Sequence, residues 1–164
     1  MIIIGYPGIG KSTLAGRESG CIDLESSDFK ELFPVGQWVV PYCTMAENLA
    51  KQGFTVFVSS HAEVRAQFFM RKTPCVVLIY PALELEEEWY ERVMKRSWHT
   101  RSDKDGRSYV RVCDHYKEDI TALMEESRYF TAYVIESMDY ILDEIVKGYE
   151  GLIKGECAED VGYT

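Results

Sequence analysis

The chain has 164 residues, of which 46% are hydrophobic and 27% are charged, and its formal net charge is −9. This composition indicates one globular domain with a core of its own. The acidic balance argues against a protein that coats nucleic acid, because such a protein needs a basic surface. The five cysteines are odd in number and widely spaced, so we expect a reducing, cytoplasmic setting. No apolar run approaches the about 18 residues that span a membrane, so we expect no membrane partner.

Short apolar segments alternate with helical patterns along the chain. In chain order, the expected elements are a strand at 1–4, a helix from 12, a strand at 21–25, a helix at 41–52, strands at 54–58 and 75–80, helices at 83–97 and 115–128, a strand at 130–135 and a helix at 138–147. The central strands show no polar alternation, which is typical of strands buried on both faces. The pattern predicts an α/β fold with a mostly parallel sheet.

Two segments carry no such pattern. Residues 100–107, "TRSDKDGR", are polar and turn-rich, so we expect a mobile loop there. Residues 151–164 lack periodicity and are expected to form a C-terminal tail behind a single domain at 1–150.

The segment "GYPGIGKST", Gly5 to Thr13, fits G-x-x-x-x-G-K-[S/T], the phosphate-binding loop or P-loop. Its glycines permit a sharp turn whose N–H groups surround a phosphate in front of a helix N-terminus. We predict that Lys11 reaches the β- and γ-phosphates of ATP and that the Ser12 hydroxyl binds Mg²⁺. The residues expected to bind the nucleotide are Gly5, Gly8, Ile9, Gly10, Lys11, Ser12 and Thr13.

Two classes of phosphate-loop protein fit poorly. A GTPase needs D-x-x-G after the third strand and N-K-x-D, but "DKDG" at 103–106 follows the fourth strand and N-K-x-D is absent. A motor or transport ATPase needs a strand that ends in acidic residues. "YILDE" at 140–144 imitates this, but its apolar neighbours repeat with helical period, so we expect Asp143 and Glu144 on a helix.

The chain resembles the P-loop kinases of small substrates: nucleoside monophosphate kinases, shikimate and gluconate kinases, and the kinase part of polynucleotide kinases. The resemblance rests on the N-terminal loop, the five short strands, the acidic "DLESSDF" after the second strand and the arginines after the fourth. It implies the P-loop NTPase fold, with a five-stranded parallel sheet in the order 2-3-1-4-5 flanked by helices. It also implies an acceptor-binding insertion at about 28–45 and a lid at about 92–113.

Within "DLESSDF", the resemblance implies a carboxylate that orients or deprotonates the acceptor. Asp28 is the first candidate, as a catalytic residue just beyond the strand, with Asp23 and Glu25 beside it as substrate-binding residues. The alternative is that Asp28 belongs to a helix N-cap formed with Ser26 or Ser27.

Three further residues are candidate substrate contacts. The third strand ends in "VSSH" and not in the acidic residue of adenylate kinases, so His61 stands at the substrate edge. Arg65 follows one helical turn later and is a candidate clamp for a phosphate or carboxylate. Trp38 either stacks a base or packs the insertion against the core.

Arg92 and Arg96 are the candidate catalytic arginines of the lid, which would stabilise charge on the transferred phosphoryl group. A salt-bridged solvent face is the alternative for Arg92. Together these features predict an ATP- and Mg²⁺-dependent phosphotransferase acting on a nucleoside, a nucleotide or another small hydroxyl compound. A polynucleotide 5′-hydroxyl kinase and a non-catalytic nucleotide-binding regulator remain alternatives.

Overall fold

The computed structural model describes residues 1–159 of the chain and the side chains of residues 1–153. Five parallel strands form one sheet in the order β2-β3-β1-β4-β5. The strands are β1 Ile2–Gly5, β2 Cys21–Asp23, β3 Thr55–Ser59, β4 Val76–Pro81 and β5 Thr131–Ile135. The expected α/β class, the parallel sheet and the strand order are therefore confirmed.

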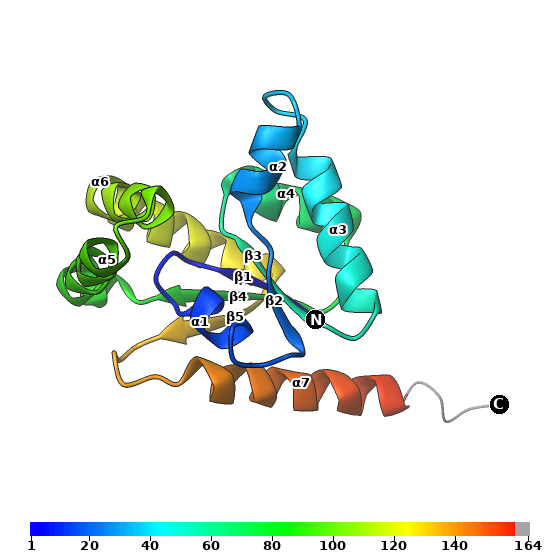
Figure 1. The fold of residues 1–164 in the computed structure, drawn as a ribbon. Coiled ribbons are helices and arrows are strands. Elements are labelled where there is room, and N and C mark those ends of the chain that lie inside the picture. The colour runs from blue at the N-terminus through cyan, green and yellow to red at the C-terminus, as the bar shows by residue number, and fades with distance from the viewer. Residues whose placement is uncertain (160–164) are drawn as a thin grey trace.

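The three central strands are buried because helices cover both faces of the sheet. Ile2, Ile3 and Ile4 of β1 are at most 1% exposed. In Figure 1, α7 runs along one face and α3 and α4 lie on the other. The helices are α1 Lys11–Ala15, α2 Ser26–Leu32, α3 Val39–Lys51, α4 Ala62–Arg71, α5 Glu86–Thr100, α6 Asp103–Glu126 and α7 Leu142–Glu159, with 3₁₀ turns at Leu83–Leu85 and Ser127–Tyr129.

The prediction of a loop at 100–107 is wrong for most of this segment, because all but two of its residues are helical. Helix α6 begins at Asp103, and only Arg101 and Ser102 separate it from α5. The Ser102 hydroxyl caps α6 by accepting a hydrogen bond from the backbone N–H of Asp105 at 3.2 Å. A serine cap followed by acidic residues in the first turn favours the start of a helix, so these polar residues belong to α6 and not to a loop.

The C-terminal helix also differs from its expected bounds. Helix α7 starts at Leu142 and continues to Glu159, so 151–159 of the expected tail are helical, and 160–164 lie outside the described residues. Asp143 and Glu144 lie in the first turn of α7, as the helical pattern predicts. Among the described residues, no helix is long and apolar enough to cross a bilayer.

The predicted lid and insertion flank the same end of the sheet. Residues 92–113 form the facing parts of α5 and α6, which make a helical hairpin. Residues 28–45 form most of α2, the connection and the first half of α3. Figure 1 shows the hairpin on one side of the sheet and α2 and α3 on the other. The last residues of β1, β2 and β3 line a cleft at this end, where ligands collect in open α/β sheets.

Candidate active site

The phosphate-loop segment connects β1 to α1 through backbone conformations that glycine supplies. Gly8 and Gly10 have φ angles of 93° and 105°, which side chains disfavour. A Cβ atom on Gly5 would lie 2.5 Å from Ile9 Cδ1, and one on Gly8 would lie 3.0 Å from Trp89 Nε1. A side chain at Gly5 would therefore require Ile9 to shift, whereas Gly8 is restricted both by its contact with Trp89 and by its positive φ.

Three side chains hold this loop from outside. Trp89 Nε1 donates to the Pro7 carbonyl oxygen at 2.8 Å, Arg92 Nε to that of Gly8 at 2.7 Å, and the Tyr140 hydroxyl to that of Ile9 at 2.8 Å. The carbonyls of 7, 8 and 9 are consecutive, so these bonds fix the orientation of consecutive peptide planes. The loop is held in one conformation by α5 and by the segment before α7.

Arg92 therefore supports the loop and does not line the cleft described below. Its guanidinium lies 5.6 Å from the Trp89 ring centroid and 5.3 Å from that of Tyr140, as in cation–π contacts. Sequence reasoning missed Trp89 and Tyr140 as loop contacts because they follow the loop residues that they bind by 82 and 131 positions. No local pattern signals such a pairing.

Lys11 is turned back onto its own loop. Its ammonium donates to the carbonyl oxygens of Gly5 at 2.7 Å and Tyr6 at 3.4 Å. Burial lowers the pKa of Lys11 to about 8, while the nearby Asp23 carboxylate acts in the opposite direction. An anion brought into the loop would favour the charged form of this lysine.

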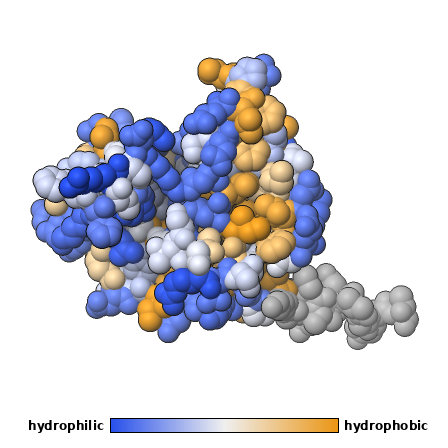
Figure 2. Space-filling view, viewed as in Figure 1, coloured by the Kyte–Doolittle hydropathy of each residue, from blue (hydrophilic) through white to orange (hydrophobic). Residues whose placement is uncertain are grey.

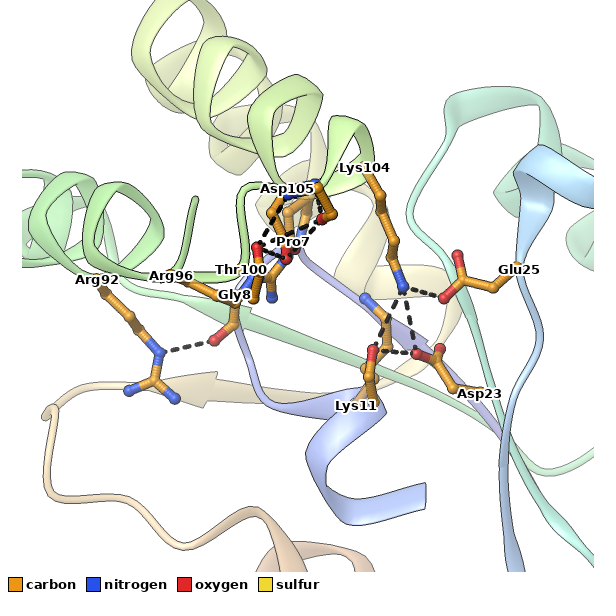
Figure 3. A network of polar contacts seen from close by, with 12 residues as sticks. Pro7, Gly8, Lys11, Asp23, Glu25, Arg92, Arg96, Thr100, Lys104 and Asp105 are labelled. Carbon is orange, nitrogen blue, oxygen red and sulfur yellow. Dashed lines mark hydrogen bonds and ion pairs between the residues drawn. The ribbon is translucent and has the colours of Figure 1, made fainter. Parts of the chain in front are cut away.

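Ser12, Asp23, Glu25 and Lys104 form one polar cluster at the start of α1, and Figure 3 shows Lys104 beside the two carboxylates. The Ser12 hydroxyl donates to Asp23 Oδ2 at 2.5 Å. Lys104 reaches from α6, pairs with Glu25, and places its Nζ 3.3 Å from Ser12 Oγ and 3.8 Å from Asp23 Oδ2. Sequence reasoning missed Lys104, although its place beside the arginines of the predicted lid was visible.

Arg96 is fixed within the α5–α6 hairpin. It pairs with Asp105, which also accepts hydrogen bonds from the hydroxyls of Thr100 at 2.6 Å and Ser102 at 3.0 Å (Figure 3). Arg96 Nε is buried and has no hydrogen-bond partner among residues 1–153. The predicted lid arginine is thus oriented by the turn between the helices and keeps one unused donor.

A cleft of about 260 Å³ lies between the loop, α2 and the start of α6. It appears in Figure 2 as a hydrophilic hollow between the hairpin and the arm formed by α2 and α3. Six of its lining side chains are Lys or Arg and only two are carboxylates, in a protein of net charge −9. Such a concentration of positive charge attracts anions. The charged lining residues are Lys11, Asp23, Glu25, Lys30, Arg96, Lys104, Arg107 and Arg111.

The structure brings Gly5, Gly8, Gly10, Lys11 and Ser12 to this cleft, together with Asp23, Glu25, His61 and Arg96. Ile9 is 1% exposed, so its side chain belongs to the core, and Thr13 is exposed on α1 outside the cleft lining.

Asp28, Arg65 and Trp38 do not line the cleft. Asp28 is exposed in the first turn of α2, and the N-cap position is Glu25, which makes no side-chain capping bond. Arg65 is 6% exposed and donates to both carboxylate oxygens of Glu126, at 2.5 and 2.9 Å, and to the Ser60 carbonyl. Trp38 is 5% exposed and packs edge-on against Tyr42. Packing is therefore the role of Trp38 that the structure shows.

His61 lines the cleft from the connection between β3 and α4. Its Nε2 is 2.9 Å from Lys30 Nζ. Burial, and secondarily the Lys30 charge, lower the pKa of His61 to about 4, so the ring is neutral near pH 7 and accepts this hydrogen bond. Ser59 also lines the cleft, and its hydroxyl oxygen is buried without a hydrogen-bond partner among residues 1–153.

No protein-family model and no curated protein matches this chain.

Proposed function

We propose that the protein is an ATP-dependent phosphotransferase that moves the γ-phosphoryl group to a small acceptor. The observation that carries the proposal is the P-loop-like turn, held from outside and opening with Lys11 and Ser12 into a cationic cleft. The loop amides and Lys11 would bind the phosphates of the donor. The acceptor would bind beside α2, which contributes Ser26, Ser27 and Lys30 to the cleft.

The residues at the cleft suit Mg²⁺. Ser12 and Asp23 offer hard oxygen ligands that already contact each other. No group of three or more His, Cys, Asp or Glu within the described part of the chain forms a metal cage, whereas Mg²⁺ commonly takes most of its ligands from phosphate and water. When bound, the ion would neutralise charge on the β- and γ-phosphates.

The transfer itself needs positioning and charge stabilisation. An acceptor oxygen forms a bond to the γ-phosphorus as the bond to the β,γ-bridging oxygen breaks, and ADP leaves with that electron pair. If the acceptor is a hydroxyl group, its proton passes to a carboxylate, for which Glu25 is the candidate. Arg96 and Lys104 stabilise the charge on the transferred group from the hairpin.

Asp23, and not Asp28, is the carboxylate that faces the loop, and this pair supplies a direct test. Wild-type protein should form ADP from ATP in an acceptor-dependent manner. Asp23→Asn should reduce turnover by about 100-fold or more, and Asp28→Asn, which removes an exposed carboxylate of the adjoining helix, should retain it.

Lys11→Ala tests the donor site independently. It should abolish ATP binding in calorimetry, and Lys51→Ala, at an exposed lysine of α3, should bind like wild type. Failure of the wild-type protein to bind ATP or GTP in the presence of Mg²⁺ would refute the proposal.

A further inference from the structure

The cleft holds more positive charge than its loop end accounts for. Lys11, Arg96 and Lys104 lie beside the phosphate loop and the Ser12–Asp23 pair. The remaining cations, on α2 and on the next turns of α6, are Lys30, Arg107 and Arg111. Lys30 belongs to the predicted acceptor-binding insertion, and the charges of Arg107 and Arg111 act on it, so these three residues form one group in the cleft.

We propose that the acceptor is a small molecule bearing a phosphate or carboxylate group, which Lys30 and Arg107 bind from opposite walls of the cleft. The inference deepens the proposed function and rests on it. The sequence did not decide between charged and uncharged acceptors, and this inference selects the charged class.

Lys30 is positioned without being neutralised. Its ammonium donates to the neutral His61 ring at 2.9 Å and lies 4.7 Å from the centroid of the buried Trp38 ring. An imidazole and an indole both orient an ammonium group, but neither supplies a negative charge. Lys30 therefore makes no ion pair within residues 1–153.

Among the cations that α6 contributes to the cleft, Arg107 is the one without an ion-pair partner within residues 1–153. Arg111 is neutralised by a bidentate pair with Asp119, at 2.9 and 2.6 Å. Arg107 is exposed and makes no ion pair or side-chain hydrogen bond within residues 1–153. Since residues 104, 107 and 111 follow helical spacing, they share one face of α6, which turns toward the cleft.

Lys30 and the α6 arginines act on one another. Burial is the main cause that lowers the pKa of Lys30, and the charges of Arg107 and Arg111 lower it further, while Glu63 acts in the opposite direction. Cations held together in this way repel each other, and a bound anion removes the repulsion. The guanidinium of Arg107 also matches the planar geometry of phosphate and carboxylate.

The size of the site favours a small acceptor over a polymer. The whole cleft, including its loop end, has a volume of about 260 Å³, close to the lower end of small-molecule pockets, about 300 Å³. The net charge of −9 also disfavours approach of a polyanion. An oligonucleotide is therefore an alternative outcome of the test and not the expected ligand.

The first experiment compares acceptors matched in shape. ADP formation is measured with nucleosides and their monophosphates, with neutral polyols and their phosphates, with hydroxy acids and their amides, and with 5′-hydroxyl oligonucleotides. Phosphorylated or carboxylated small acceptors should exceed their uncharged counterparts at least tenfold in kcat/KM. Equal use of uncharged acceptors, or use of the oligonucleotide alone, would overturn the inference.

The second experiment uses Lys30→Met and Arg107→Met, with Lys51→Met and Arg17→Met as controls at exposed positions outside the cleft. Both cleft variants should raise KM for the anionic acceptor at least tenfold while the Kd for ATP stays within twofold of wild type. Loss of ATP affinity with an unchanged acceptor KM would assign these residues to the donor and overturn the inference.

A binding measurement separates the two proposals. Inorganic phosphate is titrated by calorimetry into protein saturated with Mg²⁺ and a non-hydrolysable ATP analogue, so that the loop is already occupied. Wild type should bind phosphate, and Lys30→Met should bind it at least tenfold more weakly. Analogue binding without phosphate binding would refute the anion site alone, whereas absence of analogue binding would refute the phosphotransferase.

Discussion

Lys104 Nζ lies 3.3 Å from Ser12 Oγ, although these residues are 92 positions apart in the chain. The first turn of α6 thereby meets the first turn of α1, and the lysine charge faces Asp23 and Glu25. In the proposed reaction a Mg²⁺ ion binds beside the same oxygens. We therefore expect Lys104 and the metal ion to compete for the negative charge of Asp23 and Glu25.

Replacing Lys104 should make Mg²⁺ binding easier and transfer slower. A unit charge at about 4 Å contributes on the order of 1–4 kcal/mol near a protein surface, so Lys104→Met should lower the Mg²⁺ concentration for half-maximal activity by about threefold or more. Turnover at saturating Mg²⁺ should fall, because one charge that stabilises the transferred group is lost. Lys95→Met, at an exposed lysine of α5, is the control. An unchanged Mg²⁺ dependence of activity in Lys104→Met would contradict the expected competition between Lys104 and the metal ion.

Gly8 should not tolerate a side chain. Its φ is 93°, and a Cβ atom at this position would lie 3.0 Å from both Trp89 Nε1 and Val93 Cγ1. Gly8→Ala should therefore destabilise the fold by about 2–4 kcal/mol, and ATP affinity should fall as well. Gly20→Ala is the matched control, since nothing lies within 4 Å of its Cβ position. Chemical denaturation and calorimetry measure the two effects, and a neutral Gly8→Ala would contradict the loop geometry.

Arg65 should matter for stability and not for the acceptor. Removing one partner of a buried ion pair costs about 3–5 kcal/mol, so Arg65→Met should be strongly destabilised through Glu126. The exposed pair of Lys95 with Glu91 predicts about 1 kcal/mol or less for Lys95→Met. Acceptor KM is then measured well below the melting temperature. A raised KM for Arg65→Met there would restore Arg65 as a substrate contact.

His61 should make the fold sensitive to acid. Its folded pKa of about 4 lies below the value of about 6.5 in an unfolded chain, so between these values the unfolded state binds the extra proton. Stability is therefore lost as pH falls from about 6.5 toward 4. The stability advantage of wild type over His61→Gln should shrink by about 1–2 kcal/mol across that range.

Two measurements check this behaviour. Urea denaturation at a series of pH values gives the difference between wild type and His61→Gln. NMR titration of the His61 ring gives its pKa directly, and Lys30→Met should raise that pKa because the Lys30 charge lowers it. A His61 ring that titrates near 6.5 in the folded wild-type protein would contradict the structure.

Parts of the candidate site can be read from local sequence. The glycine spacing and Lys11–Ser12 mark a loop, because each residue acts through its own backbone or a neighbour a few positions away. Arg96 stands among the arginines after the fourth strand and does line the cleft. Asp23 and Glu25 are the secondary carboxylates of the sequence pattern. The sequence pattern favours Asp28 over these two, because Asp28 lies just beyond the strand. Position alone does not show that the Asp28 side chain points away from the cleft.

Other parts depend on contacts between distant segments. The sequence predicts that Arg65 binds substrate, but Arg65 meets Glu126, 61 positions later. Lys104 and Lys30 join the site only because α6 and α2 lie across the same cleft. The serine cap at 102 turns an expected loop into a helix, and that helix sets the spacing of Lys104 and Arg107.

The sequence by itself determined the α/β class, the strands and the phosphate-loop segment, because hydrophobic periodicity and glycine spacing are local properties. Tertiary structure decided which charges face one another. Trp89, Arg92 and Tyr140 meet consecutive loop carbonyls, and Lys30 faces the arginines of α6. Such pairings depend on how helices return across the sheet, and on burial that changes the pKa values of His61 and Lys11, so local pattern cannot specify them.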